Sequence, residues 1–305
     1  MPVRDPGRRL DARRRHARRR PPRPAGPGPT RAAGRTRPAL GPLLGLALVP
    51  ALALLLSVAG CLVIPATSSP PRTWPTGPAP SWQWQLTGPL DLTVEAEVYA
   101  LDVFRTPAED VQRLRTRDRH PVCYVEVGTY QDFRPDAARF PAAVLGRPTG
   151  SPGGRWLDIR QWATLEPILA DRFRLCRGKG FTAVMPAGMD GYAHPSGFPL
   201  TFDDQLTFNR RLATLARRTQ LSPGLTNDLD QVLALEPYFD FAVNEECFRR
   251  EECHRLVPFV DAGKPVFHVE YQGSAADFCS TTLGYGFASI RKDRNLGPRR
   301  DTCPT

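Results

Sequence analysis

Short apolar runs that recur along the chain from about residue 98 onward constrain its fold most strongly. Eight runs of four to seven residues are rich in β-branched and aromatic side chains and do not alternate strictly between apolar and polar. Such runs are typical of strands that are buried on both faces of a parallel sheet. They are Val98–Phe104, Val122–Val127, Arg155–Ile159, Phe181–Met185, Gly224–Asn227, Phe239–Asn244, Pro265–Glu270 and Gly286–Arg291.

Helical patterns fill several of the gaps between these runs. Apolar residues fall at helical spacing in 165–178, and a second helical pattern over 201–220 opens on Thr-x-x-Asp. Eight strands with helices between most of them predict an α/β fold, a (β/α)8 TIM barrel forming a single domain. A dinucleotide-binding fold is disfavoured because no Gly-x-Gly-x-x-Gly follows a strand.

The part of the chain before the barrel resembles an export leader followed by a spacer. Residues 1–39 are rich in Arg and Pro and cannot bury a core, which predicts a disordered leader. Residues 40–61 form an uncharged apolar segment that ends in Val-Ala-Gly before Cys61, the pattern of a signal peptide h-region with a bacterial lipobox. We therefore expect Cys61 to be lipidated; the alternative is an uncleaved membrane span that happens to end in Cys. A Pro-rich linker follows over 62–81, and the barrel is expected over 82–305.

Either interpretation of the apolar segment places the barrel outside the cytoplasmic membrane, anchored by lipid or secreted. The apparent basicity of the chain belongs to the leader, because residues 1–60 hold 13 of the 41 Lys and Arg residues and 2 of the 31 Asp and Glu residues. The remainder is close to neutral, which argues against a nucleic-acid partner. We expect a monomer.

Six cysteines remain after Cys61, and an even number in an exported protein indicates disulfides. The short separation of Cys247 and Cys253 makes them the favoured pair. The pairing of Cys123, Cys176, Cys279 and Cys303 stays open. No Cys-x-x-Cys occurs and the histidines are scattered, so we expect no metal site, and no cofactor motif is present.

Acidic residues gather where the predicted strands end, which is where TIM barrels carry their functional side chains. This acidic set, with few Lys or His, is typical of a carbohydrate site, and nearby aromatic rings could stack on sugars. For Trp82 and Trp84, a plug in the barrel and a sugar platform are both open. The polar candidates are Asp102, Glu126, Asp190, Asn227, Asp228, Glu245 and Glu270, and the tyrosines are Tyr124, Tyr130, Tyr192 and Tyr271.

Several longer blocks of the sequence resemble glycoside hydrolase family 114, the endo-α-1,4-polygalactosaminidase group. These blocks occur in the family's order and span nearly all of 82–294. They are Trp82–Leu86, Val98–Phe104, Val122–Tyr124 with Gly128, Phe133–Asp136, Arg155–Arg160, Asp190–Tyr192, Ser196–Leu200, Asn227–Gln231 and Asn244–Cys247.

The resemblance implies a barrel that acts on galactosamine polymers, with a catalytic carboxylate at Glu245. This chain differs from the family pattern at the end of the fourth predicted strand. The family has an acidic residue followed by Pro-Asp-Asn there, whereas this chain has Met185-Pro186-Ala187-Gly188. Ala187 therefore stands where the second catalytic carboxylate is expected, and glycoside cleavage normally needs two such groups.

Three hypotheses follow from this departure. The first is an active hydrolase in which Glu126, Asp190 or Glu270 replaces the missing acid. The second, which we favour, is an envelope-anchored barrel that binds an amino-sugar polysaccharide but has lost most of its hydrolytic activity, since losing a general acid or nucleophile costs several powers of ten in rate. The third is a structural envelope protein without a sugar ligand.

Overall fold

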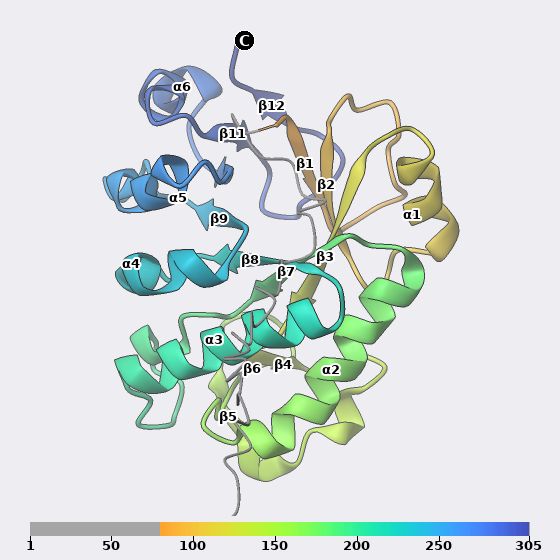
Figure 1. Ribbon diagram of the computed structural model, residues 1–305, viewed down its shortest axis with the longest axis vertical. Coiled ribbons are helices and arrows are strands. Elements are labelled where there is room, and N and C mark those ends of the chain that lie inside the picture. Colours follow the sequence, from red (N-terminus) through yellow and green to blue (C-terminus); the bar gives the residue numbers. More distant parts are fainter. Residues whose placement is uncertain (1–79, 305) are drawn as a thin grey trace, which may run out of the picture. The chain divides into compact units, whose positions relative to one another are not determined.

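The computed structural model describes residues 80–304, in which eight parallel strands form one curled sheet with helices on its outer side (Figure 1). Each strand lies beside the next barrel strand in the chain, which confirms the expected α/β barrel. In spatial order the strands are β1 (Trp82–Gln85), β2 (Val98–Asp102), β3 (His120–Glu126), β7 (Ala183–Ala187), β8 (Ser222–Thr226), β9 (Phe241–Glu245), β10 (Val266–Glu270) and β11 (Ala288–Arg291), with the short antiparallel β12 (Asp301–Thr302) beside β11.

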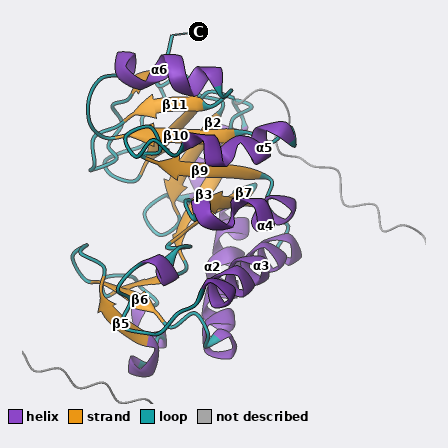
Figure 2. Cartoon of the chain, turned by 90° about the vertical axis from the view of Figure 1, so that its left-hand side faces the viewer, coloured by secondary structure: helices purple, strands orange, loops and turns teal. Residues whose placement is uncertain are grey.

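The main sheet has eight parallel strands, as expected, but one of the eight predicted strands does not belong to it. The run 155–159 contributes β6 (Gly154–Leu157) to a separate antiparallel sheet with β4 (Thr129–Gln131) and β5 (Leu145–Pro148). Figure 2 shows β5 and β6 set apart from the strands of the main sheet. The missing barrel strand is β1, whose four residues are all buried although Gln occupies two of the positions.

Between β1 and β11 the barrel is bridged by the segment that follows β11. No strand ladder joins β1 to β11 in the described residues. Instead, Gln83 on β1 donates to the Pro298 carbonyl at 2.6 Å and accepts from the Lys292 ammonium at 2.9 Å. The Leu86 amide also donates to the Leu296 carbonyl. Side-chain and loop hydrogen bonds thus replace the last strand pairing of a closed ring.

The helices follow the strands and cover the sheet from outside. Helix α3 begins with the capping box that the Thr-x-x-Asp pattern predicts, formed by Thr201 and Asp204. Helix α2 begins at residue 162, earlier than expected, so Pro167 lies in its second turn. The helices are α1 (Ala108–Arg115), α2 (Trp162–Lys179), α3 (Phe202–Arg218), α4 (Val232–Leu235), α5 (Val257–Asp261) and α6 (Ala275–Gly284).

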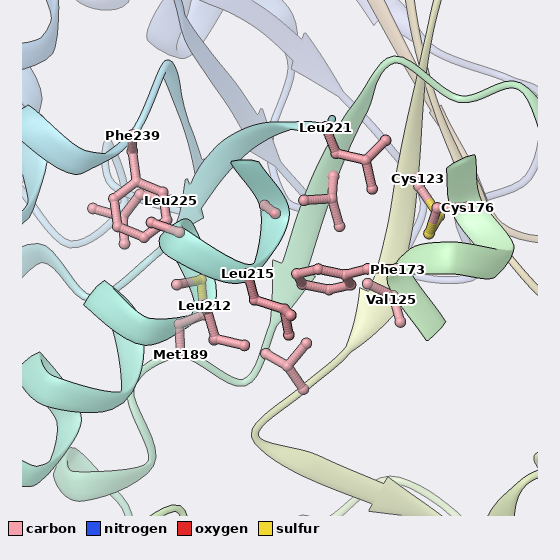
Figure 3. Close-up of a cluster of buried hydrophobic side chains, with 14 of the residues drawn as sticks. Cys123, Val125, Phe173, Cys176, Met189, Leu212, Leu215, Leu221, Leu225 and Phe239 are labelled. Carbon is pink, nitrogen blue, oxygen red and sulfur yellow. A yellow bond between two sulfur atoms is a disulfide. The ribbon is translucent and has the colours of Figure 1, made fainter. Parts of the chain in front are cut away.

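Two apolar clusters fill the two sides of the sheet. The outer cluster lies between the strands and the helices and includes Phe173 of α2 and Leu212 of α3 (Figure 3). The inner cluster contains Trp82 and Trp84, which are only 1% and 2% exposed. The two indoles are therefore a plug in the barrel interior rather than a surface on which sugars could stack.

Three disulfides tie the described residues together. Cys247 and Cys253, the pair expected from their short separation, are bonded and close the loop after β9. Cys123–Cys176 joins β3 to α2, and Cys279–Cys303 joins α6 to the C-terminal segment. None of the helices in residues 80–304 has the length and apolar content that a membrane crossing needs. The leader, Cys61 and nearly all of the linker lie outside the described residues.

Candidate functional site at the carboxyl ends of the strands

Strand alternation selects which residues face the barrel interior at its carboxyl end. On β3 the side chains of Val122 and Tyr124 pack in the inner cluster. Alternate residues of a strand share a face, so Glu126 also points toward the barrel interior. On β7 the same count leads to Ala187, which pairs in register with Glu126. On β9 it leads to Glu245. On β2 Val98 and Ala100 belong to the inner cluster, so Asp102 lies on the same face. The mouth of the barrel thus has carboxylates on β2, β3 and β9, with an alanine on the strand beside Glu126.

Glu245 is held by partners from both neighbouring strands. Its Oε2 accepts a hydrogen bond from the Tyr271 hydroxyl at 2.6 Å, and its Oε1 accepts from the Asn227 amide at 3.1 Å. The Asn227 Oδ1 in turn accepts from the Glu245 backbone N–H at 3.0 Å. Asn227 has a φ of 55°, a left-handed conformation that asparagine tolerates better than most residues. This strand end is therefore shaped to fix the direction of one carboxylate.

Burial raises the pKa of the Glu245 carboxyl above its ordinary value, although the hydrogen bonds from Tyr271 and Asn227 oppose this shift. The charges of Asp190 and Glu126 raise the same pKa further, so these two carboxylates lie close enough to Glu245 to interact with it. A carboxyl with a raised pKa is suited to deliver a proton, which is the property required of a general acid.

Glu126 has its own set of hydroxyl donors. Its Oε1 accepts from the Tyr124 hydroxyl at 2.6 Å, and its Oε2 accepts from the Thr129 hydroxyl. Burial raises the pKa of Tyr124 well above its usual range, and the adjacent Glu126 charge adds to the shift. Tyr124 therefore stays protonated and donates a hydrogen bond to Glu126, just as Tyr271 donates one to Glu245.

Asp190 lies in the loop after β7 and pairs with a histidine that we did not anticipate from the sequence. The His194 Nε2 lies 3.3 Å from the Asp190 Oδ2, and the imidazole stacks on Trp156 with ring centroids 4.6 Å apart. The hydrogen bond to Asp190 raises the pKa of His194. A signal was available, because His194 follows Asp190 by four residues, but the stacking partner comes from the separate β4–β6 sheet.

Asp228 faces the helical layer and belongs to a buried polar network. Its Oδ2 accepts from the Asn209 amide of α3 at 2.8 Å, while its Oδ1 has no hydrogen-bond partner. Asn209 also donates to the Met189 carbonyl at 2.9 Å. The network thus links α3 to the loop that carries Asp190. Burial raises the pKa of Asp228 to about 9, and the charge of Asp190 adds to the shift.

We predict that the Asp228→Asn variant loses a pH dependence of stability. The folded-state pKa of about 9 lies above the ordinary value of 3.8, so between them the folded protein binds more protons than the unfolded chain. The stability that Asp228 contributes is therefore complete below about pH 4 and falls as pH rises toward 9, by up to about 1.4 kcal/mol per pH unit. Asparagine mimics the protonated acid and should flatten this slope.

Urea unfolding of the wild type and of Asp228→Asn at several pH values between 5 and 8.5 measures this effect, at roughly 1.4 kcal/mol per pH unit if Asp228 alone carries it. The exposed Asp203 on α3 provides the control, because Asp203→Asn should keep the wild-type slope. Equal slopes in all three proteins would show that Asp228 is ionised in the folded state.

Two of the acidic candidates, Asp102 and Glu270, are buried and form hydrogen bonds or ion pairs with other parts of the fold. Asp102, 3% exposed, forms an ion pair with Arg134 at 2.7 Å and accepts two backbone amides. Glu270, 2% exposed, accepts from His268 at 2.9 Å and from the backbone of the disulfide loop at Phe248. On β10 the inner cluster takes Phe267, Val269 and Tyr271, so Glu270 faces the other side of the sheet. Asp102 is therefore engaged by Arg134 and by backbone amides, and Glu270 points away from the barrel interior.

The remaining candidate tyrosines differ in position. Tyr192 donates to the Asp230 carboxylate at 3.0 Å, and Tyr130 packs edge-on against Phe140. Neither is bonded to Glu126 or Glu245. The Arg294 guanidinium lies 4.7 Å from the centre of the Tyr271 ring, a contact that no pattern in the sequence predicted.

In the described residues, one group has sulfur and nitrogen atoms close enough to hold a metal ion: Cys247, Cys253 and His268. Because the two cysteines are bonded to each other, their sulfurs are not thiolates and are poor ligands in this state.

Comparison with known proteins places these features in a family. The model of glycoside-hydrolase family GH114 matches residues 64–305. The crystal structure of Ega3 from Aspergillus fumigatus in complex with galactosamine aligns with a TM-score of 0.72 and 30% identity, over 76% of this chain and 98% of that chain. The glycoside hydrolase domain of PelA from Pseudomonas aeruginosa shares the fold, with a TM-score of 0.60 and 13% identity over 73% of this chain and 99% of that one. No curated protein sequence matches the chain.

Proposed function

This chain belongs to glycoside-hydrolase family GH114, and from that premise we propose that it is an extracytoplasmic barrel that binds a galactosamine-type polysaccharide and hydrolyses it slowly or not at all. One observation carries the second half of this proposal. The inward-facing residue at the carboxyl end of β7 is Ala187, at the position where the resemblance to the family implies an acid. Glu245 cannot by itself both protonate the leaving oxygen and attack or activate water in one step.

The charge of the mouth supports an amino-sugar ligand. The charges of Glu126 and Asp190 both act on Glu245. A protonated amino sugar is attracted by such a cluster whether or not it is cleaved. The similarity to a protein solved with galactosamine supports the same class of ligand. Binding can therefore outlast the loss of one catalytic group.

We expect the purified protein to bind oligogalactosamine and to release almost no reducing ends from it. Calorimetry measures the binding, and a reducing-sugar assay measures the cleavage. Glu245→Gln should weaken binding by about tenfold, because it removes a charge-assisted contact, and should leave the low rate unchanged. Absence of binding at millimolar oligogalactosamine would remove the amino sugar as ligand and favour a structural envelope role.

A second candidate function is an active hydrolase, and one observation favours it. Glu126 faces the interior on the strand beside Ala187, in register with it, and its charge reaches Glu245. It could therefore replace the missing acid, and Asp190 is the other candidate. Rapid cleavage by the wild type that is lost in Glu126→Gln but retained in Asp190→Asn would support Glu126 in this role.

We also propose that Cys61, outside the described residues, is the lipidated N-terminus of the mature protein. It follows the apolar segment directly after Val-Ala-Gly. Radiolabelled palmitate fed to expressing cells should label the wild type and not Cys61→Ser. Label that persists in this variant would contradict lipidation at Cys61.

A further inference from the structure

A groove on the outer helical face lies apart from the barrel mouth. It has a volume of about 400 Å³ and runs between α2 and α3, which lie side by side in Figures 1 and 2. None of its lining residues stands at the end of a barrel strand. The lining consists of Trp162, Thr207, Arg210, Arg211, Thr214 and Arg218.

The groove carries an excess of positive charge. The Glu166 carboxylate pairs with Arg218 at 2.7 Å and also accepts from the Trp162 indole. No carboxylate in residues 80–304 pairs with Arg210 or Arg211. The Arg211 guanidinium lies instead 5.7 Å from the Trp162 ring. The Arg210 guanidinium lies 5.0 Å from the Tyr238 ring and donates to the Ala234 carbonyl at 3.4 Å. The guanidiniums of Arg211 and Arg218 thus line the groove, and Glu166 pairs with only one of them.

The cationic and hydroxyl groups form a line. Thr207, Arg211, Thr214 and Arg218 follow one another on one face of α3 at intervals of four, three and four residues. Arg211 and Arg218 are therefore about 10 Å apart along the helix axis. An extended chain with repeated negative charges at about this spacing can contact both guanidiniums.

We propose that this groove binds a segment of an acidic polysaccharide of the uronate type. Guanidinium groups recognise carboxylates in a bidentate manner, the threonine hydroxyls suit sugar hydroxyls, and the partly exposed Trp162 offers an aromatic surface. A galactosamine polymer is excluded, because its ammonium groups are repelled by the arginines. The groove is independent of the proposed amino-sugar site, so the protein can hold two polymers of opposite charge.

Calorimetry of the complete mature protein with oligogalacturonate tests this proposal. Binding should be detectable, should weaken with added salt, and should fall by about tenfold or more in Arg211→Gln/Arg218→Gln. Arg174→Gln provides the matched control, since Arg174 is an exposed arginine of α2 outside the groove that pairs with Asp171. Glu166→Gln removes the competing carboxylate and should tighten binding.

Several outcomes would overturn the proposal. If Arg174→Gln lost as much affinity for oligogalacturonate as the groove variant, the binding would depend on general surface charge and not on the groove. Equally tight binding of inorganic tripolyphosphate would show that sugar recognition is absent. Because oligogalactosamine binding depends on Glu245 and not on the groove, it should be unchanged in Arg211→Gln/Arg218→Gln, and its presence or absence tests the proposed function separately.

Discussion

We expect Ala187→Asp to raise the rate of oligogalactosamine cleavage by about 10²- to 10⁴-fold, the usual contribution of one general acid or base. The new carboxyl faces the barrel interior in register with Glu126, on the same face of the sheet as Glu245. The adjacent Glu126 charge raises the pKa of the introduced acid, which favours proton donation. A reducing-end assay on the single variant measures the gain.

The single substitution is a better test than restoring the whole family segment. Met185 is completely buried in the inner cluster, so Met185→Glu would place an unpaired charge in the core. Gly188 has a φ of 75°, and a Cβ added there would approach Thr129 to 3.0 Å, so Gly188→Asn is strained. Ala187→Asp alone avoids both the charge in the core and the strained backbone.

Ala187→Asn is the matched control, because it has the same shape as Asp and cannot donate a carboxyl proton. The double variant Ala187→Asp/Glu245→Gln should return to the low starting rate, since Glu245 is the other half of the pair. Brisk hydrolysis by the wild type that survives Glu245→Gln would place the chemistry elsewhere in the protein and contradict the assignment of this site.

We expect Arg134→Met to lower the free energy of unfolding by about 3–5 kcal/mol, because it removes the ionic partner of the buried Asp102. The two side chains are 8% and 4% exposed and lie 2.7 Å apart. The exposed Arg113, paired with Asp110 on α1, provides the contrast. Arg113→Met should cost less than about 1 kcal/mol.

Urea unfolding at neutral pH measures both changes, and calorimetry on the folded fraction separates stability from binding. If Asp102 has a structural role, Arg134→Met should bind oligogalactosamine with the wild-type affinity. A large loss of oligogalactosamine affinity in a stable variant would indicate that Asp102 contributes to the ligand site, as the sequence predicted.

The sequence placed the candidate carboxylates at strand ends but could not determine which face of the sheet each side chain occupies. Glu270 and Tyr271 are adjacent, yet one supports the disulfide loop and the other donates to Glu245. Successive residues of a strand point to opposite faces, so an error of one residue in the expected register exchanges a site residue for a scaffold residue. The run 155–159 shows a related limit, because strand character does not say which sheet a strand joins.

By itself the sequence determined the features that depend on residues close together in the chain. These include the alternation of strands and helices, the capping box at Thr201, the short Cys247–Cys253 loop and the absence of an acid at position 187. Only the tertiary structure decided which distant groups meet, such as Asp102 with Arg134 and Trp156 with His194. Such pairs depend on how strands and helices pack in space, and no local pattern of residue types encodes that packing.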